Sequence, residues 1–450
     1  MKTTFSLFTF LLIYSLLFTA SAQGIVFESG SWSDAIRKAR KEKKLFFLHF
    51  DSPTCGGCNE VASRAFNSPL MREKFAQHFI SYRTNGTVGV GKGLADQYEV
   101  ACVPSSVFLD VDENPLARFC GTTSFDRAYL EKAEEAITKN RERPMKSLSD
   151  AYARGDRSSA LMRQYITRRS EMGLSVDKLL DEYVTQLPKD SLQSGSVLRF
   201  LFEQAPVVGS KADSIFRHDR RRMDSLYRAV GWNKAVELNR WITDNSIRKA
   251  VRNNDVGLAS RTAYFRQRTY NSDIRGGRMA RDWVMLSYFK GIKDTLRYLE
   301  QAVPYYDTYF MPARVDSIQK LDELDMQRRM KGQLPPTAAS LKPGQSLMQF
   351  TPYPNTQRYV TALNQAAWEF YEMTRDTTYL TKALTWSKRS LEYREDGSLM
   401  DTYAHLLYRL GRKDEALTWQ AKAVQVEQER NSPLLAAMQE ALRKMKAGTL

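Results

Sequence analysis

Cysteine is scarce in this chain, with four residues among 450. Small secreted domains that rely on disulfides in place of a hydrophobic core carry far more. The chain does not need such support, because hydrophobic residues make up 42% of it and can build ordinary cores. We therefore expect the few sulfurs to have a chemical rather than a structural role.

Histidine is equally scarce, and the four residues are scattered along the chain: His49, His78, His218 and His405. A zinc site at Cys55 and Cys58 would need two more ligands, and Cys102 and Cys120 do not form a second Cys-x-x-Cys pair. Nicotinamide and flavin fingerprints are missing. The glycines at 89–93 lack the spacing and the Lys-Ser/Thr pair of a phosphate loop. We expect neither a metal nor an organic cofactor.

Long apolar runs are missing everywhere except near the first residue. Lys2 precedes an apolar run over residues 5–18, and Ala20-Ser21-Ala22 then offers the small-x-small pattern of a signal-peptidase site. This pattern predicts a signal peptide over residues 1–22, cleaved after Ala22. The mature protein is then expected to be exported, as a soluble periplasmic or cell-envelope protein without a membrane span. A retained N-terminal anchor is the alternative, because the run is almost long enough to span a membrane.

Acidic residues are outnumbered, and the formal net charge is +16. The excess is concentrated at residues 217–290, where 17 Lys/Arg stand against 7 Asp/Glu, a local charge of +10. This segment could meet lipid headgroups, polyanionic polysaccharide or acidic proteins; solvated helix faces are the alternative. Nucleic acid is not expected as a partner, because the protein is predicted to be exported and carries no nucleic-acid-binding motif.

A chain of this length is expected to form about two or three domains. The first, residues 24–140, alternates helical and strand patterns in the order helix (33–43), strand (45–50), helix (to about 66), helix (from 69), strand (79–84), glycine-containing loop (89–93), short helix (to about 98), β-hairpin (105–121) and helix (124–139). This order predicts a small α/β domain.

The first strand runs directly into Cys55-Gly56-Gly57-Cys58 at the start of a helix. Two thiols with this spacing can close a disulfide, and the helix dipole favours the thiolate of the first. The arrangement suits reversible dithiol–disulfide chemistry. A zinc site and a static structural disulfide are the alternatives.

Three signatures make residues 24–140 similar to the thioredoxin-like proteins exported to bacterial envelopes: Trp32-Ser33-Asp34-Ala35 before Lys43-Lys44, Cys55-Gly56-Gly57-Cys58, and Tyr98-Glu99-Val100-Ala101-Cys102-Val103-Pro104-Ser105. The resemblance implies a thioredoxin fold in which Cys55 attacks, Cys58 resolves the mixed disulfide, and the two close as a Cys55–Cys58 disulfide. It also implies a substrate loop at Val103 and a cis Pro104 that faces this pair. The expected partners are protein thiols or disulfides and an upstream dithiol protein that donates or accepts electrons.

The sequence departs from the family pattern at three places. Thr54 replaces the usual Trp, and Gly56-Gly57 lacks the usual Pro, so the reduction potential cannot be transferred from the family. Six residues before Cys55, where thioredoxins keep a buried carboxylate, this chain has His49. His49 could accept a proton, because imidazole titrates near neutrality; a hydrogen-bonded core histidine is the alternative.

Cys102 and Cys120 are open to several interpretations. Cys102 precedes Pro104 by two residues, and Cys120 falls late in the hairpin, near the same end of the sheet. Free thiols, a second disulfide and a regulatory cap on the first pair are all compatible with these positions. For Cys120, we expect a small buried hydrophobic residue.

Beyond residue 140 helical periodicity replaces strand signals. We expect an α-helical repeat region at 141–330, a loop or linker rich in Pro, Gly, Ser and Thr at 331–356, and helical repeats at 357–450. Ala383-Leu384-Thr385-Trp386 recurs 33 residues later as Ala416-Leu417-Thr418-Trp419. This resembles tetratricopeptide repeats, whose period is about 34 residues. Such a solenoid binds peptides or proteins; a purely structural helical cap on the first domain is the alternative.

The sequence therefore predicts an α/β thioredoxin-like fold followed by an all-α tetratricopeptide-like solenoid. The expected function is an exported thiol-disulfide oxidoreductase that acts on protein disulfides, with clients or partners bound at the helical repeats. The alternative is a non-catalytic protein-binding scaffold of the cell envelope with a vestigial thioredoxin fold. The sequence does not decide between reductase, oxidase and isomerase, because tens of millivolts set the direction.

Overall fold

The computed structural model describes residues 24–450 apart from 53–57, 59–60, 62–63, 101, 122, 124, 142–144, 218, 331–352, 431 and 433. The predicted signal peptide lies outside this part of the chain. Two compact units are present, the first ending at Phe200 and the second beginning at Leu201. Among the described residues, no helix combines the length and the apolar character needed to cross a membrane.

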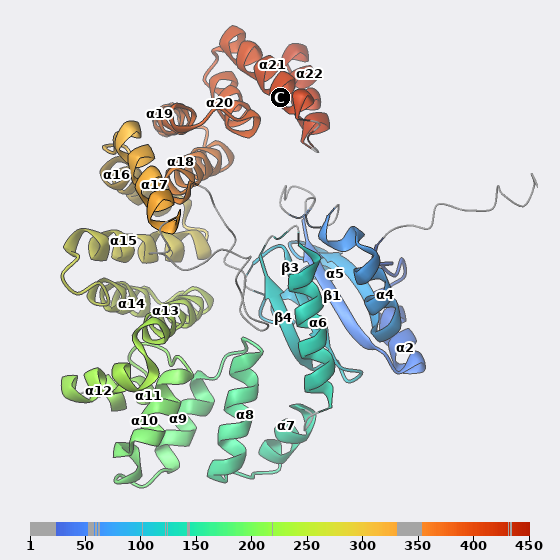
Figure 1. Ribbon diagram of the computed structural model, residues 1–450, viewed down its shortest axis with the longest axis vertical. Coiled ribbons are helices and arrows are strands. Elements are labelled where there is room, and N and C mark those ends of the chain that lie inside the picture. Colours follow the sequence, from blue (N-terminus) through green and yellow to red (C-terminus); the bar gives the residue numbers. More distant parts are fainter. Residues whose placement is uncertain are drawn as a thin grey trace, which may run out of the picture. The chain divides into compact units, whose positions relative to one another are not determined.

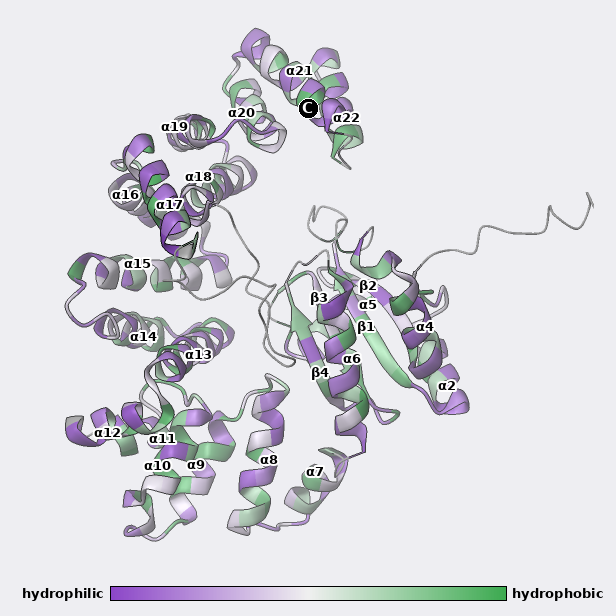
Figure 2. Cartoon of the chain, viewed as in Figure 1, coloured by the Kyte–Doolittle hydropathy of each residue, from purple (hydrophilic) through white to green (hydrophobic). Residues whose placement is uncertain are grey.

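The first unit contains a four-stranded mixed sheet in the order β2-β1-β3-β4 (Figure 1). Its strands are β1 (Leu45–Asp51), β2 (Phe79–Asn85), β3 (Ser105–Leu109) and β4 (Pro115–Cys120). β1 pairs with β2 in parallel, while β1–β3 and β3–β4 are antiparallel. β1 is buried at every position. Its hydrophobic run is coloured green in Figure 2. The predicted α/β domain and its β-hairpin are confirmed.

Helices cover both faces of this sheet because β1 alternates its side chains between two cores. Phe47 packs on one face with residues of α4 (Pro69–His78) and α6 (Asp126–Asn140). Phe46 and Leu48 pack on the other face with residues of α2 (Trp32–Glu42) and α5 (Gly89–Gln97). An apolar central strand covered on both faces is the usual result of a parallel pair with crossover helices.

The helix starts follow from local capping. Ser31 forms a capping box with Asp34 at the start of α2. Ser68 accepts a hydrogen bond from the Met71 N–H at 3.4 Å, with Pro69 in the first turn of α4. The predicted start of α4 is confirmed, whereas α2 begins at Trp32, one residue before the predicted start, with Ser31 rather than Ser33 as its cap.

The predicted loop at 89–93 is wrong, because these residues are the first turns of α5. A Cβ atom at Gly91 would overlap the Asn85 carbonyl group at the end of β2. Glycine is used here to let a helix approach a strand closely, not to make a flexible loop.

Further helices complete the first unit: α7 (Met145–Ala153), α8 (Ser159–Glu171), α9 (Asp177–Gln186), the short η3 (Ser191–Gln193) and the first part of α10 (Gly195–Glu203). They attach to the sheet domain through polar contacts. Arg168 Nη2 donates to the Lys139 carbonyl at 2.8 Å, and the Ser175 N–H donates to Glu99 Oε2 at 3.2 Å. α8 and the turn that follows it therefore pack on the domain that precedes them.

In the described part of the second unit, all the secondary-structure elements are helices. Its elements are α11 (Lys211–Arg217), α12 (Arg220–Val230), α13 (Trp232–Asn253), α14 (Val256–Arg268), α15 (Ile274–Gly291), α16 (Thr295–Tyr309), α17 (Val315–Met330), α18 (Pro354–Met373), α19 (Thr377–Tyr393), α20 (Gly397–Arg409), α21 (Lys413–Glu429) and α22 (Leu435–Ala447). The all-α region is confirmed. The predicted linker lies mostly outside the described residues, and α18 begins at Pro354.

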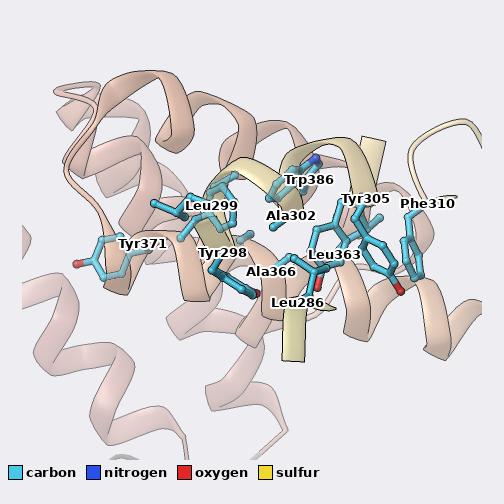
Figure 3. Packing of buried hydrophobic residues seen from close by; sticks show 14 of the residues in the cluster. Leu286, Tyr298, Leu299, Ala302, Tyr305, Phe310, Leu363, Ala366, Tyr371 and Trp386 are labelled. Atoms are coloured by element: carbon cyan, nitrogen blue, oxygen red, sulfur yellow. The ribbon is translucent and has the colours of Figure 1, made fainter. Parts of the chain in front are cut away.

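The 33-residue repeat falls on α19 and α21, each preceded by a helix across a three-residue connection. Short connections make consecutive helices antiparallel neighbours. In the largest core of this unit, Ala302 of α16, Leu363 of α18 and Trp386 of α19 are fully buried. Figure 3 shows side chains from these helices converging on one cluster.

Candidate redox site

Three segments meet at the end of the sheet where β1 leaves it. The Gly86 N–H, just after β2, donates to the Asp51 carbonyl oxygen at 2.9 Å. An atom in the Cβ position of Gly86 would lie 3.4 Å from Val103 Cγ2. The end of β1 therefore lies beside the loop that contains Val103 and Pro104.

The predicted redox pair follows β1 at this end. Thr54, Cys55, Gly56 and Gly57 lie outside the described residues. Cys58 is helical, fully buried and disulfide-bonded. The Cys55–Cys58 pairing stays a prediction.

The Val103–Pro104 peptide bond is cis, as the resemblance implies. Pro104 is buried and Val103 is half-buried, so the loop presents part of the Val103 side chain to the surface. A hydrogen bond holds Pro104 to the adjacent backbone, because its carbonyl oxygen accepts from the Gly121 N–H at 3.1 Å.

Cys102 and Cys120 form a disulfide, with their Cα atoms 6.0 Å apart. Of the alternatives left open by the sequence, a second disulfide is therefore the one observed. The expectation that Cys120 is a buried hydrophobic residue is wrong. β4 leaves the core at its C-terminal end, and its last residue is exposed.

Arg118 is a supporting residue that the sequence analysis missed. From β4, its guanidinium donates to the Tyr98 carbonyl at 2.8 Å and to the Glu99 carbonyl at 3.3 Å. These carbonyls belong to the segment that leads into the Val103–Pro104 loop. A signal was available, because an arginine in an otherwise apolar strand, two residues from a cysteine, has few reasons to be there except to bind neighbouring backbone.

Removing the second disulfide is expected to loosen this loop. For the double variant Cys102→Ala/Cys120→Ala, loss of a cross-link with a sequence separation of 18 residues should lower stability by about 3 kcal/mol. Hydrogen exchange of the β3 and β4 amides measures the change, with the α18–α21 amides of the same sample as the control. Unchanged protection of β3 and β4 would show that the bond does not constrain this region.

His49 lies in the core and not at the surface of the site. It is 1% exposed, its Nδ1 lies 2.9 Å from Ser106 Oγ, and its ring packs edge-on against Phe66. Burial lowers the pKa of His49 to about 3, and the positive charge of Arg83 adds to this effect. Nε2 is buried without a hydrogen-bond partner among the described residues. The geometry is that of a neutral, hydrogen-bonded core histidine, and a role in accepting a proton stays a prediction.

The charges next to this end of the sheet are paired. Asp51 is 9% exposed and forms an ion pair with Arg83 of the neighbouring strand. Within the described part of the chain, no three His, Cys, Asp or Glu side chains come close enough together to hold a metal ion. His49, His78 and His405 lie in different elements, and His218 is outside the described residues.

Comparison with protein-family models agrees with this fold. Residues 32–134 match the family model of a thioredoxin-like domain. None of the curated proteins matches the chain. The solution structure of a putative disulphide-isomerase from Bacteroides thetaiotaomicron is 23% identical, with a TM-score of 0.24, over 28% of this chain and 99% of that one. A structure of the DsbH oxidoreductase is 21% identical, with a TM-score of 0.23, over 27% of this chain and 89% of that one. Residues 32–134 of this chain are a thioredoxin-like domain.

Proposed function

We propose that this chain is an exported protein thiol-disulfide oxidoreductase that works through Cys55 and Cys58. The observation that carries the proposal is the position of the Cys-x-x-Cys segment, which in the sequence follows β1 at the end of the sheet where the cis Val103–Pro104 loop also lies. Full burial of Cys58 supports a resolving role, because a buried sulfur is shielded from external thiols.

In the proposed reaction, the Cys55 thiolate attacks one sulfur of a client disulfide. The client S–S bond breaks, a mixed disulfide with Cys55 forms, and the second client sulfur leaves as a thiolate that takes up a proton. The Cys58 thiolate then attacks Cys55 Sγ, closes the Cys55–Cys58 disulfide and releases the reduced client. An upstream dithiol protein returns two electrons; with an upstream oxidant, the same steps run in reverse.

Pro104 and Val103 contribute the surface on which the client backbone lies in this proposal. The Cys102–Cys120 bond, Arg118 and the Gly121 N–H support that surface from β4. Preorganisation of this kind lowers the entropy cost of client binding. The antiparallel pairs α18–α19 and α20–α21 are proposed to be tetratricopeptide-like repeats that recruit clients or partners.

The test is insulin reduction and refolding of scrambled disulfides, with wild-type protein and Cys55→Ser in parallel. We expect the substitution to abolish both activities, because the attacking thiolate is lost. Cys58→Ser is the matched control. It should keep the attacking sulfur but accumulate mixed disulfides, whose partners mass spectrometry identifies as clients. Activity that survives Cys55→Ser, or that is absent from the wild-type protein, would favour the scaffold alternative.

A further inference from the structure

A second site lies in the second unit, far along the sequence from the cysteines. Side chains of α11 to α14, with the turn that follows α14, enclose a pocket of about 1050 Å³. Its volume is at the upper end of the range found for ligand pockets in proteins. Among the described residues that line it, none comes from the thioredoxin-like domain or from the repeat at α18–α21.

One wall of this pocket is aromatic and exposed. Trp232, at the start of α13, is 59% exposed, and Tyr264 of α14 is 61% exposed. Phe265 follows Tyr264 and also lines the pocket. Exposed aromatic side chains that line a pocket often mark a binding site. In protein interfaces, aromatic residues also contribute much of the binding energy.

The other feature of the pocket is uncompensated positive charge. Arg261, Arg266 and Arg268 line it, all from α14. Arg261 and Arg268 are exposed, and within the described residues neither has an ion-pair partner. Arg266 is not free in the same way: its Nη2 lies 3.4 Å from the Tyr270 hydroxyl, and its charge also interacts with the carboxylate of Asp244.

The one carboxylate among the described lining residues does not neutralise these arginines. Asp213 is 3% exposed and accepts hydrogen bonds from Arg217 and from the Gly209 N–H, the latter at 2.9 Å. Its charge is thus matched by Arg217 alone. The pocket keeps the guanidinium groups of Arg261 and Arg268 available for an anion, inside the segment that carries a local charge of +10.

We propose that this arginine–aromatic pocket binds an acidic polypeptide segment that contains aromatic or aliphatic side chains. Guanidinium groups form bidentate hydrogen bonds with carboxylates. The aromatic wall would pack against the apolar side chains that lie between the carboxylates of the peptide. A uniform polyanion such as polyglutamate would use the arginines but leave the aromatic wall unoccupied. The proposal adds a binding site, separate from the α18–α21 repeats, to the proposed function and does not depend on its redox part.

The experiment is calorimetric titration of the purified protein with a short synthetic peptide of alternating glutamate and phenylalanine. We expect saturable binding that weakens with added salt, and that is lost when glutamine replaces glutamate in the peptide. Each of Arg261→Gln and Arg268→Gln should weaken binding about tenfold, as expected for one charge-assisted hydrogen-bonding partner. Trp232→Ala should weaken it by a similar factor.

Arg240→Gln is the matched control, because Arg240 is an exposed arginine of α13 that does not line the pocket. It should leave the affinity unchanged, and circular dichroism confirms that each variant keeps its helices. Equal binding of the glutamine peptide, or insensitivity to both arginine variants, would overturn the proposal. Tight binding of polyglutamate that Trp232→Ala does not affect would overturn it in favour of a general polyanion surface.

Redox activity is measured on the same samples to separate this inference from the proposed function. Cys55→Ser should bind the peptide as the wild-type protein does, and the pocket variants should reduce insulin normally. Peptide binding without redox activity would refute the enzyme proposal only. Redox activity without peptide binding would refute the pocket proposal only.

Discussion

Replacing Trp386 by alanine is expected to lower the free energy of unfolding of the second unit by about 3–5 kcal/mol. Trp386 is fully buried in α19, and its ring packs edge-on against Phe370 at a centroid distance of 4.8 Å. Its indole N–H donates to Asp307 Oδ1 of α16 at 2.9 Å. The substitution therefore leaves a cavity where three helices meet and removes a hydrogen-bond donor from a carboxylate (Figure 3).

The internal repeat supplies a matched control for this experiment. Trp419 is the equivalent residue 33 positions later, but it is only half-buried, at the edge of Tyr403. Trp419→Ala should therefore cost less than half as much, because less surface returns to water and the site stays open to solvent. Urea denaturation followed by circular dichroism measures both variants. Equal losses would mean that Trp386 and Trp419 contribute equally to the free energy of unfolding, contrary to the difference in their burial.

Most of the sheet domain was predictable because its signals are local. An apolar run specifies a strand covered on both faces; residues 45–50 are apolar apart from His49, and β1 is buried throughout. Ser68 before Pro69 specifies a helix start that needs no tertiary information. The order of such elements then leaves few topologies, and the thioredoxin-like one is observed.

The errors came from residues whose role depends on distant neighbours. Gly91 looked like part of a flexible loop, but its lack of a side chain serves the contact between α5 and the Asn85 carbonyl. Cys120 looked like a buried hydrophobic residue, because the sequence cannot show where a strand leaves the core. A second disulfide was one of the alternatives that the sequence left open, and the register of β3 and β4, which places Cys120 opposite Ser105 and near the Cys102 loop, explains why it forms.

The arginine–aromatic pocket was also beyond the reach of the sequence. The local charge excess of residues 217–290 was evident, but solvated helix faces explained it equally well. The structure distinguishes the two interpretations, because α13 and α14 bring Trp232 and Arg261 to the same pocket. Charge counts alone carry no information about such convergence.

Acid is expected to destabilise the sheet domain through His49. Burial lowers the pKa of this side chain in the folded state to about 3, whereas an unfolded chain has the ordinary value near 6.5. Between these values the unfolded state binds more protons than the folded state, so stability falls as the pH decreases. The contribution is fully present above about pH 6.5 and is lost by about pH 3. The separation of the two pKa values corresponds to about 5 kcal/mol.

Asp and Glu side chains titrate in part of the same range, so the test uses a difference between two proteins. His49→Asn keeps a group that can hydrogen-bond to Ser106 Oγ but removes the titration. The stability of the wild-type protein minus that of the variant should therefore decrease steadily from pH 6.5 towards pH 3. Parallel curves would show that His49 is not buried as a neutral ring.

The same variant addresses the proton-acceptor prediction, because a histidine with so low a pKa is a weak base. If His49 accepts the Cys58 proton in spite of this, His49→Asn should slow the release of mixed disulfides in the client assay; an unchanged rate would leave His49 with a packing role only.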